Sequence, residues 1–289
     1  MDSIWQKFTD WLKDILVGGI MSNLTGMFDN VNAKVGEIAG QVGSTPQSWN
    51  GSIYNMIRSL SDNVILPISG VILAFVMTIE LIGLITERNN MHDIDTWLFF
   101  KWIFKTACAV LIISNTWNIV MGIFEAAQNI VSNASGVIVG STSIGMADNI
   151  ADLEARLNSM EVSELLGLWL QSFIVGITMW VMTICIFLIT YGRMIEIYIV
   201  ASVAPIPMAT MVSREGGGME QNYLRSLCAL GFQGVLIIVC VAIYAVLVRN
   251  MVVASEIGAA IWTCMGYTVL LCFSLFKTGS LAKSIFNAH

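Results

Sequence analysis

Charge is scarce in this chain, and the shortage excludes an ordinary soluble fold. Of the 289 residues, 12% are charged and 56% are hydrophobic, whereas soluble domains usually carry about 25% charged residues. The formal net charge is −6, so the chain as a whole does not attract nucleic acid or an anionic lipid surface. The composition therefore predicts a protein that lies largely within a membrane.

Residues that build metal sites and nucleophilic sites are also rare. The two histidines, His92 and His289, lie far apart, and the six cysteines all fall in apolar runs without a CxxC pair. Such cysteines are typical of packing residues. The chain contains no GxxxxGK[ST] loop and no HExxH helix, which are signatures of nucleotide and zinc chemistry. We therefore expect a protein that is not an enzyme, with no catalytic residue, no metal site and no cofactor.

Long apolar runs stand in place of these features. Between Leu165 and Met211 the only charged residues are Arg193 and Glu196. This run is more than twice the roughly 20 residues that a helix needs to cross a bilayer. It predicts two consecutive passes, with a hinge at residues 191–193.

Two prolines, Pro205 and Pro207, lack amide donors and are expected to break a helix at membrane depth. If this segment re-enters the membrane without crossing it, most lysines and arginines near span ends fall on one side, which is then the cytoplasmic side. Six complete crossings would remove this bias. We therefore expect five full spans, a broken or re-entrant element, the N-terminus outside and the C-terminus inside. The other spans are predicted at about residues 64–85, 97–120, 227–248 and 257–276.

The predicted fold class is all-α, a polytopic membrane protein with five to six transmembrane helices and N-terminal amphipathic helices. Residues 1–62 are expected to form those amphipathic helices, with an interruption at Gly18-Gly19. The helices lie either on the membrane surface or in a soluble cap. Residues 63–121 hold the first two spans. Residues 122–164 are expected to be an acidic extracytoplasmic loop with a short amphipathic helix, and residues 165–289 the C-terminal bundle with the proline break.

Charges inside the predicted spans are candidate functional groups, because an ionisable group within a membrane persists when it is paired or faces water. Arg193 and Glu196 are three residues apart and can pair on one helix face. Glu80 has no local partner, so Lys101 or Lys105 on the next span is its natural counter-ion, unless these lysines extend to the interface. The candidate structural or path-lining residues are Glu80, Lys101, Lys105, Arg193, Glu196, Pro205 and Pro207.

Two runs of residues near the proline break carry a family resemblance. The first comprises Ile195, Tyr198, Val200, Ala201, Ala204, Pro205, Ile206, Pro207, Met208 and Ala209, and the second comprises Gly218, Asn222, Tyr223, Leu224 and residues 229–234. With an amphipathic N-terminal region, two spans and a central loop, this pattern resembles the TrbL-type polytopic subunit of conjugative type IV secretion systems. The resemblance is clearest over residues 165–276. The short N-terminal region is more similar to versions from Gram-positive mobile elements.

The resemblance implies a channel and scaffold subunit that forms a homo-oligomer in the bacterial cytoplasmic membrane. Its implied partners are membrane lipid and other type IV secretion subunits, including ATPases, with transient passage of DNA or protein. The alternative is a small-solute secondary transporter with a midplane site at the broken helix. Against that alternative, the first half of the chain shows no matching interrupted segment. An assembly chaperone or immunity protein is a third option.

Overall fold

The computed structural model describes residues 2–86, 96–142, 147–211, 218–251 and 257–288, and the elements within these ranges are all helices. The chain divides into two compact units that are described separately below. Unit 1 comprises residues 1–43, 132–190 and 235–278, and unit 2 comprises residues 44–131, 191–234 and 279–289. Four helices contribute residues to both units, namely α6 (Thr116–Thr142), α8 (Val162–Ser202), α10 (Met219–Met251) and α11 (Ile257–Ile285).

Five helical segments in the described residues are long and apolar enough to cross a membrane. They are Gly51–Thr86, Trp97–Ser114, Val162–Ser202, Met219–Val248 and Gly258–Ile285. This result confirms the predicted fold class of an all-α, polytopic membrane protein.

Unit 1 begins with α1 (Asp2–Val42), a single helix of 41 residues. The predicted interruption at Gly18 and Gly19 is wrong, because the helix continues through both. A glycine in a helix costs only about 1 kcal/mol relative to alanine, and Gly19 allows the close approach of Trp169, whose Nε1 would lie 2.7 Å from an added Cβ. The helix ends at Val42, directly before a turn at Gly43.

The second long helix, α8 (Val162–Ser202), is also continuous, so the predicted hinge at residues 191–193 is wrong. Tyr191 packs edge-on against Trp49 at 5.3 Å, and Arg193 is buried. These contacts hold the backbone helical on both sides of Gly192. At about 1.5 Å per residue, α8 is roughly 60 Å long, about twice the thickness of a hydrocarbon core.

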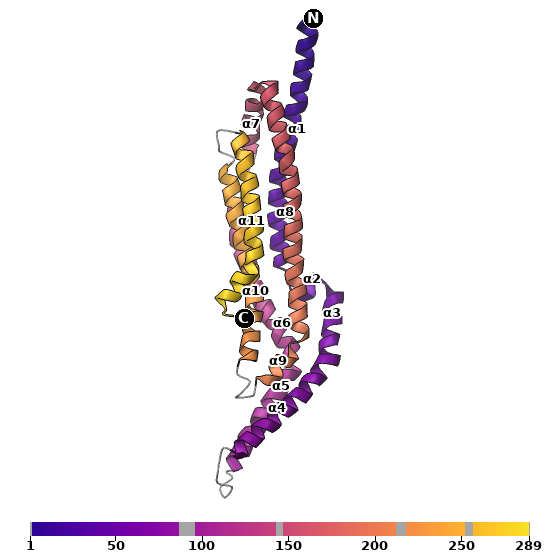
Figure 1. Ribbon diagram of the computed structural model, residues 1–289, viewed down its shortest axis with the longest axis vertical. Coiled ribbons are helices and arrows are strands. Elements are labelled where there is room, and N and C mark those ends of the chain that lie inside the picture. Colours follow the sequence, from indigo (N-terminus) through magenta and orange to yellow (C-terminus); the bar gives the residue numbers. More distant parts are fainter. Residues whose placement is uncertain (1, 87–95, 143–146, 212–217, 252–256, 289) are drawn as a thin grey trace. The chain divides into compact units, whose positions relative to one another are not determined.

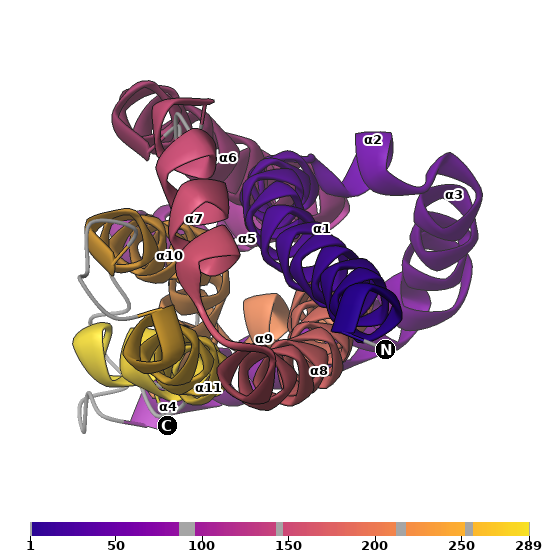
Figure 2. The ribbon, with the colours of Figure 1, turned by 90° about the horizontal axis from the view of Figure 1, so that it is seen from above.

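The rest of unit 1 is built from the end of α6, α7 (Ala147–Ser159), the second half of α10 (Met219–Met251) and most of α11 (Ile257–Ile285). The segments of α8 and α11 in this unit run side by side in Figure 1 and Figure 2. Gly258 of α11 faces α8, since an added Cβ would lie 3.4 Å from Oε1 of Gln171. The hydroxyl groups of Tyr244 and Thr268 join α10 to α11 by a hydrogen bond of 2.9 Å.

Unit 2 contains α2 (Pro46–Trp49), α3 (Gly51–Leu60), the π-helical turn η1 (Ser61–Ile65), α4 (Leu66–Thr86), α5 (Thr96–Ser114), most of α6 (Thr116–Thr142) and α9 (Pro205–Thr210). The short helix α9 packs against both α4 and α5, as Figure 1 shows. Its Met208 and Ala209 form a core with Leu73, Met77, Ala109 and Ile113.

The span predicted at residues 97–120 is interrupted at Asn115. Its side-chain amide donates to the carbonyl of Leu111 at 2.9 Å, and asparagine side chains that bond locally compete with helical geometry. Beyond this turn, α6 extends through Thr142, so the segment expected to be a loop from residue 122 begins as a helix. The reason is a buried face at helical spacing, formed by Trp117, Val120, Met121, Phe124, Gln128 and Val131.

Candidate functional site

The seven residues predicted to be structural or path-lining all fall in unit 2. They come from three places: the neighbouring helices α4 and α5, the last turns of α8, and α9. By position these are Glu80, Lys101, Lys105, Arg193, Glu196, Pro205 and Pro207. The interactions around these residues form the candidate site.

Arg193 is the most deeply buried cation of the candidate site, with 3% of its surface exposed. Its Nε donates to the carbonyl of Leu230 at 3.2 Å and its Nη2 to the carbonyl of Gly231 at 3.4 Å, both on α10. A carbonyl oxygen has two lone pairs, so it can accept these bonds in addition to its helical bond. Gly231 also brings α10 close to α6, because an added Cβ would lie 2.8 Å from Cβ of Ala127. Arg193 therefore links α8 to α10 where α10 also meets α6.

Glu196, the residue predicted to pair with Arg193, forms an ion pair with a distant lysine. Oε1 of Glu196 accepts from Nζ of Lys283, near the end of α11, at 3.1 Å. Both side chains are more than 40% exposed, and an exposed pair of this kind contributes about 0–1 kcal/mol. A pairing to a residue 87 positions away leaves no local signature in the sequence.

Glu80 pairs with Lys105, one of its two predicted partners. The Oε1–Nζ distance is 2.5 Å, and the carboxylate side chain is 9% exposed. One turn away, Nε1 of Trp102 donates to the carbonyl of Met77 at 3.1 Å, so two polar contacts join α4 to α5. Lys101 lies instead over the ring of Trp97, with its Nζ 5.7 Å from the centroid.

The proline break falls where it was predicted, between the end of α8 and the start of α9. The amide of Ala204 bonds to the carbonyl of Ala201 at 3.3 Å, so the carbonyl of Val200 loses the partner that a regular helix would supply. The hydroxyl of Tyr223 on α10 donates to that carbonyl at 2.9 Å. Because a freed backbone group inside a membrane needs a partner in the protein or water, Tyr223 stabilises the break.

Three further aromatic contacts, which were not predicted, hold the short helices of unit 2. The hydroxyl of Tyr198 on α8 donates to the carbonyl of Pro46 at 2.5 Å, and Trp49 packs against the Tyr198 ring at 6.0 Å. Nε1 of Trp117 donates to the hydroxyl of Tyr54 at 3.0 Å. The signal available in the sequence was a tyrosine or tryptophan inside an apolar run, because the O–H or N–H group of such a residue finds a hydrogen-bond partner when it is buried.

Taken together, these contacts connect the helices of unit 2 through polar groups. Within the ranges that the structure describes, no group of three or more histidine, cysteine, aspartate or glutamate side chains could hold a metal ion. His92 lies outside the described residues. The geometry is that of apolar helices joined to one another by polar contacts.

A sequence model of the family described as TrbL/VirB6 plasmid conjugal transfer like protein matches residues 31–205. The matched range runs from the second half of α1 to the first proline of the break. It therefore includes most of the candidate site and lies further toward the N-terminus than the predicted region of resemblance, residues 165–276. No curated protein and no solved structure matches the chain.

Proposed function

The chain belongs to the TrbL/VirB6 plasmid conjugal transfer-like family, and on that premise we propose that it is a channel and scaffold subunit of a conjugative type IV secretion machine. Membership makes the protein a component of a conjugal transfer apparatus. The finer proposal is that several copies form a homo-oligomer in the cytoplasmic membrane around a path for DNA or protein. The N-terminus then lies outside and the C-terminus inside.

The family match, which covers more than half of the chain, is the observation that carries this proposal. The distribution of burial supports it. In the span Met219–Val248, 50% of the residues in an apolar stretch of 18 residues are buried within the chain, whereas the share in the span Trp97–Ser114 is 11%. The outward face of the second span carries large apolar side chains, which lipid or other subunits must cover. These are Trp97, Phe100, Ile103, Phe104, Val110 and Leu111.

Other subunits supply the energy in this proposal. The sequence contains no phosphate-binding loop of the GxxxxGK[ST] type, which is the pattern that cradles nucleotide phosphates in many ATPases. ATPases of the same machine are therefore the proposed partners. The polar-bonded helices of unit 2 suit a scaffold, since hydrogen-bonded networks in a low dielectric hold one geometry.

The test is a mating assay with donor cells that lack this chain. We expect plasmid transfer to be lost and then restored by the wild-type chain supplied in trans, with donor growth unchanged throughout. Normal transfer without the chain would reject the proposal.

A second measurement addresses the homo-oligomer. We expect native mass spectrometry of protein extracted into nanodiscs to give a closed assembly of several copies or a complex with secretion ATPases. A monomer without partners, combined with saturable uptake of a solute, would instead identify a transporter.

A further inference from the structure

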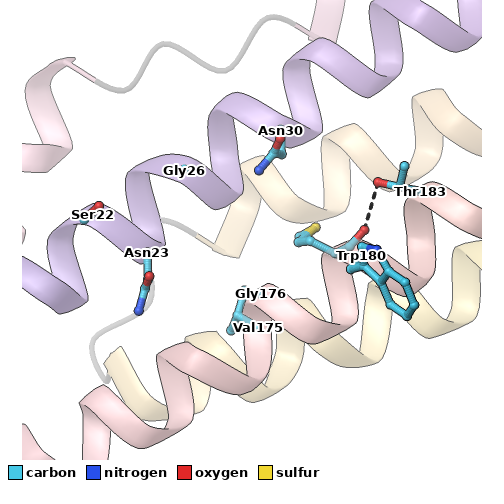
Figure 3. Close-up of a pocket in the computed structure, with 9 residues that line it drawn as sticks. Ser22, Asn23, Gly26, Asn30, Val175, Gly176, Trp180 and Thr183 are labelled. Carbon is cyan, nitrogen blue, oxygen red and sulfur yellow. Dashed lines mark hydrogen bonds between the residues drawn. The ribbon is translucent and has the colours of Figure 1, made fainter.

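A polar groove lies between α1 and α8 in unit 1 (Figure 3). Ser22, Asn23 and Asn30 border it from α1, and Trp180 and Thr183 border it from α8. It has a volume of about 360 Å³, which is enough for several water molecules at about 30 Å³ each. Its lining is uncharged and combines polar and apolar side chains.

The groove opens where the contact between the two helices ends. Toward the N-terminus of α1, Gly19 packs closely on Trp169, and Nδ2 of Asn23 donates to Oγ of the buried Ser172 at 2.9 Å. Further along, an added Cβ at Gly26 or Gly176 would meet no atom within 4 Å. The backbones of α1 and α8 therefore border open space at these two glycines.

The position of the groove along α8 places it deep in the membrane. The helix carries no charge from residue 165 to residue 192, and its groove residues, 175–183, lie in the middle of that run. Phe173, Ile177 and Val181 are exposed at the same level. A helix surface of this composition belongs at the level of the hydrocarbon core.

The opposite wall has a different character, because α1 is not among the five apolar spans found in the described residues. Asn23 bonds to Ser172, 149 positions later, and this parallel register puts Asp29 near the level of residue 178. Asp29 and Asn30 are both exposed, and one turn onward Lys34 pairs with Glu37 at 2.5 Å. Charged side chains at this depth face water or protein in preference to lipid.

We propose that the groove, together with the polar side of α1 next to it, forms one wall of a water-filled path at the middle of the membrane. The inference rests on the proposed channel function and assigns the wall to unit 1. The wall therefore consists of uncharged side chains, polar ones among them, beside Asp29. Water fills the groove, and a hydrophilic substrate passes along it.

The test compares single cysteines placed at one depth on two faces of α8. Gly176→Cys puts a thiol in the groove, and its neighbour Ile177→Cys puts one on the exposed apolar face. Gly26→Cys probes the α1 wall. Each full-length variant is treated in membrane vesicles with a charged, membrane-impermeant maleimide applied to both faces, and mass spectrometry of peptides separates each new thiol from the native cysteines. Labelling after denaturation shows that every thiol is intact.

We expect Gly176→Cys and Gly26→Cys to react at least about tenfold faster than Ile177→Cys, because the reactive thiolate forms in water and not in hydrocarbon. Equal protection of all three positions would overturn the proposal, since lipid or protein would then fill the groove. Equal and fast labelling of Gly176→Cys and Ile177→Cys would also overturn it, since this part of α8 would then lie outside the hydrocarbon.

This experiment and the mating assay can fail independently. Labelling is measured in resting membranes without transfer. If the groove cysteines react quickly but the chain is dispensable for conjugation, the channel function is rejected and the water-filled groove is retained. If the groove cysteines are protected but the chain is required for transfer, the water-filled groove is rejected and the function is retained.

Discussion

The two units use different interactions to hold their helices together. In the described part of unit 1, the bonds from Asn23 to Ser172 and from Tyr244 to Thr268 join helices through neutral side chains, and the ion pair Lys34–Glu37 lies within one helix. In unit 2 charged groups and backbone carbonyls join separate helices, as in Arg193 to Leu230 and Glu80 to Lys105. The comparison shows that charged residues of the membrane-spanning segments lie at contacts that hold the helices of unit 2 together.

The largest effect is expected from removing the buried cation of unit 2. Arg193→Ala deletes two charge-assisted hydrogen bonds to α10 and leaves a cavity, so we expect a loss of about 3 kcal/mol in stability. The matched change in unit 1, Asn23→Ala, removes one neutral bond and should cost about 1 kcal/mol. Thermal stability in detergent, followed by size-exclusion chromatography, measures both. Equal effects would erase the distinction between the units.

The next effect concerns the proline break. Replacing Pro205 and Pro207 together by alanine restores amide donors, so we expect α8 to continue into α9 and transfer to fall by more than about tenfold in the mating assay. Immunoblotting of membranes checks that the variant is inserted. Normal transfer by a stably inserted variant would show that the break is unimportant.

The role of Tyr223 can be tested by changing it both in the wild-type chain and in the double proline variant. Tyr223→Phe alone leaves the carbonyl of Val200 without its donor and should cost about 1–2 kcal/mol. In the double proline variant, the amide of residue 204 can return to that carbonyl, so Tyr223→Phe should then cost little. A double-mutant cycle on thermal stability measures this coupling. Additive effects would contradict the assigned role of Tyr223.

A smaller effect is expected from close helix packing in unit 2. Gly231→Ala brings a methyl group to 2.8 Å from Cβ of Ala127, and such overpacking costs about 1–3 kcal/mol. The control is Gly192→Ala on α8, where an added Cβ meets nothing within 4 Å. That change should stabilise the helix by about 0.5–1 kcal/mol. The prediction fails if the two variants shift the melting temperature in the same direction.

The smallest effect is expected at the exposed pair of unit 2. Glu196→Gln removes the bond to Lys283, and both side chains are more than 40% exposed, so the change should cost less than about 1 kcal/mol. Salt titration of the wild-type melting temperature provides an independent check, because exposed ion pairs are screened. A loss of stability as large as that of Arg193→Ala would mean that exposed charges hold the helices of unit 2 together as strongly as buried ones.

Several features of the fold and the candidate site could be predicted because their signals are local. The apolar runs predicted the membrane helices, and the missing amide donors of Pro205 and Pro207 predicted the break. Glu80 was matched to two lysines, and the structure selected Lys105. Two of the failures share one cause. Glycines at residues 18, 19 and 192 looked like interruptions, but packing by Trp169 and by the neighbours of Gly192 keeps those helices continuous.

The sequence by itself determined that this is an all-helical membrane protein, since hydrophobicity and proline chemistry act within a few residues of each position. Only the tertiary structure decided which polar groups meet. Lys283 finds Glu196 across 87 positions, and Tyr223 supplies the donor that Val200 lacks. The neutral groove of unit 1 likewise exists only because α1 lies in parallel register with α8. These pairings depend on distances between helices, which no local pattern of residues encodes.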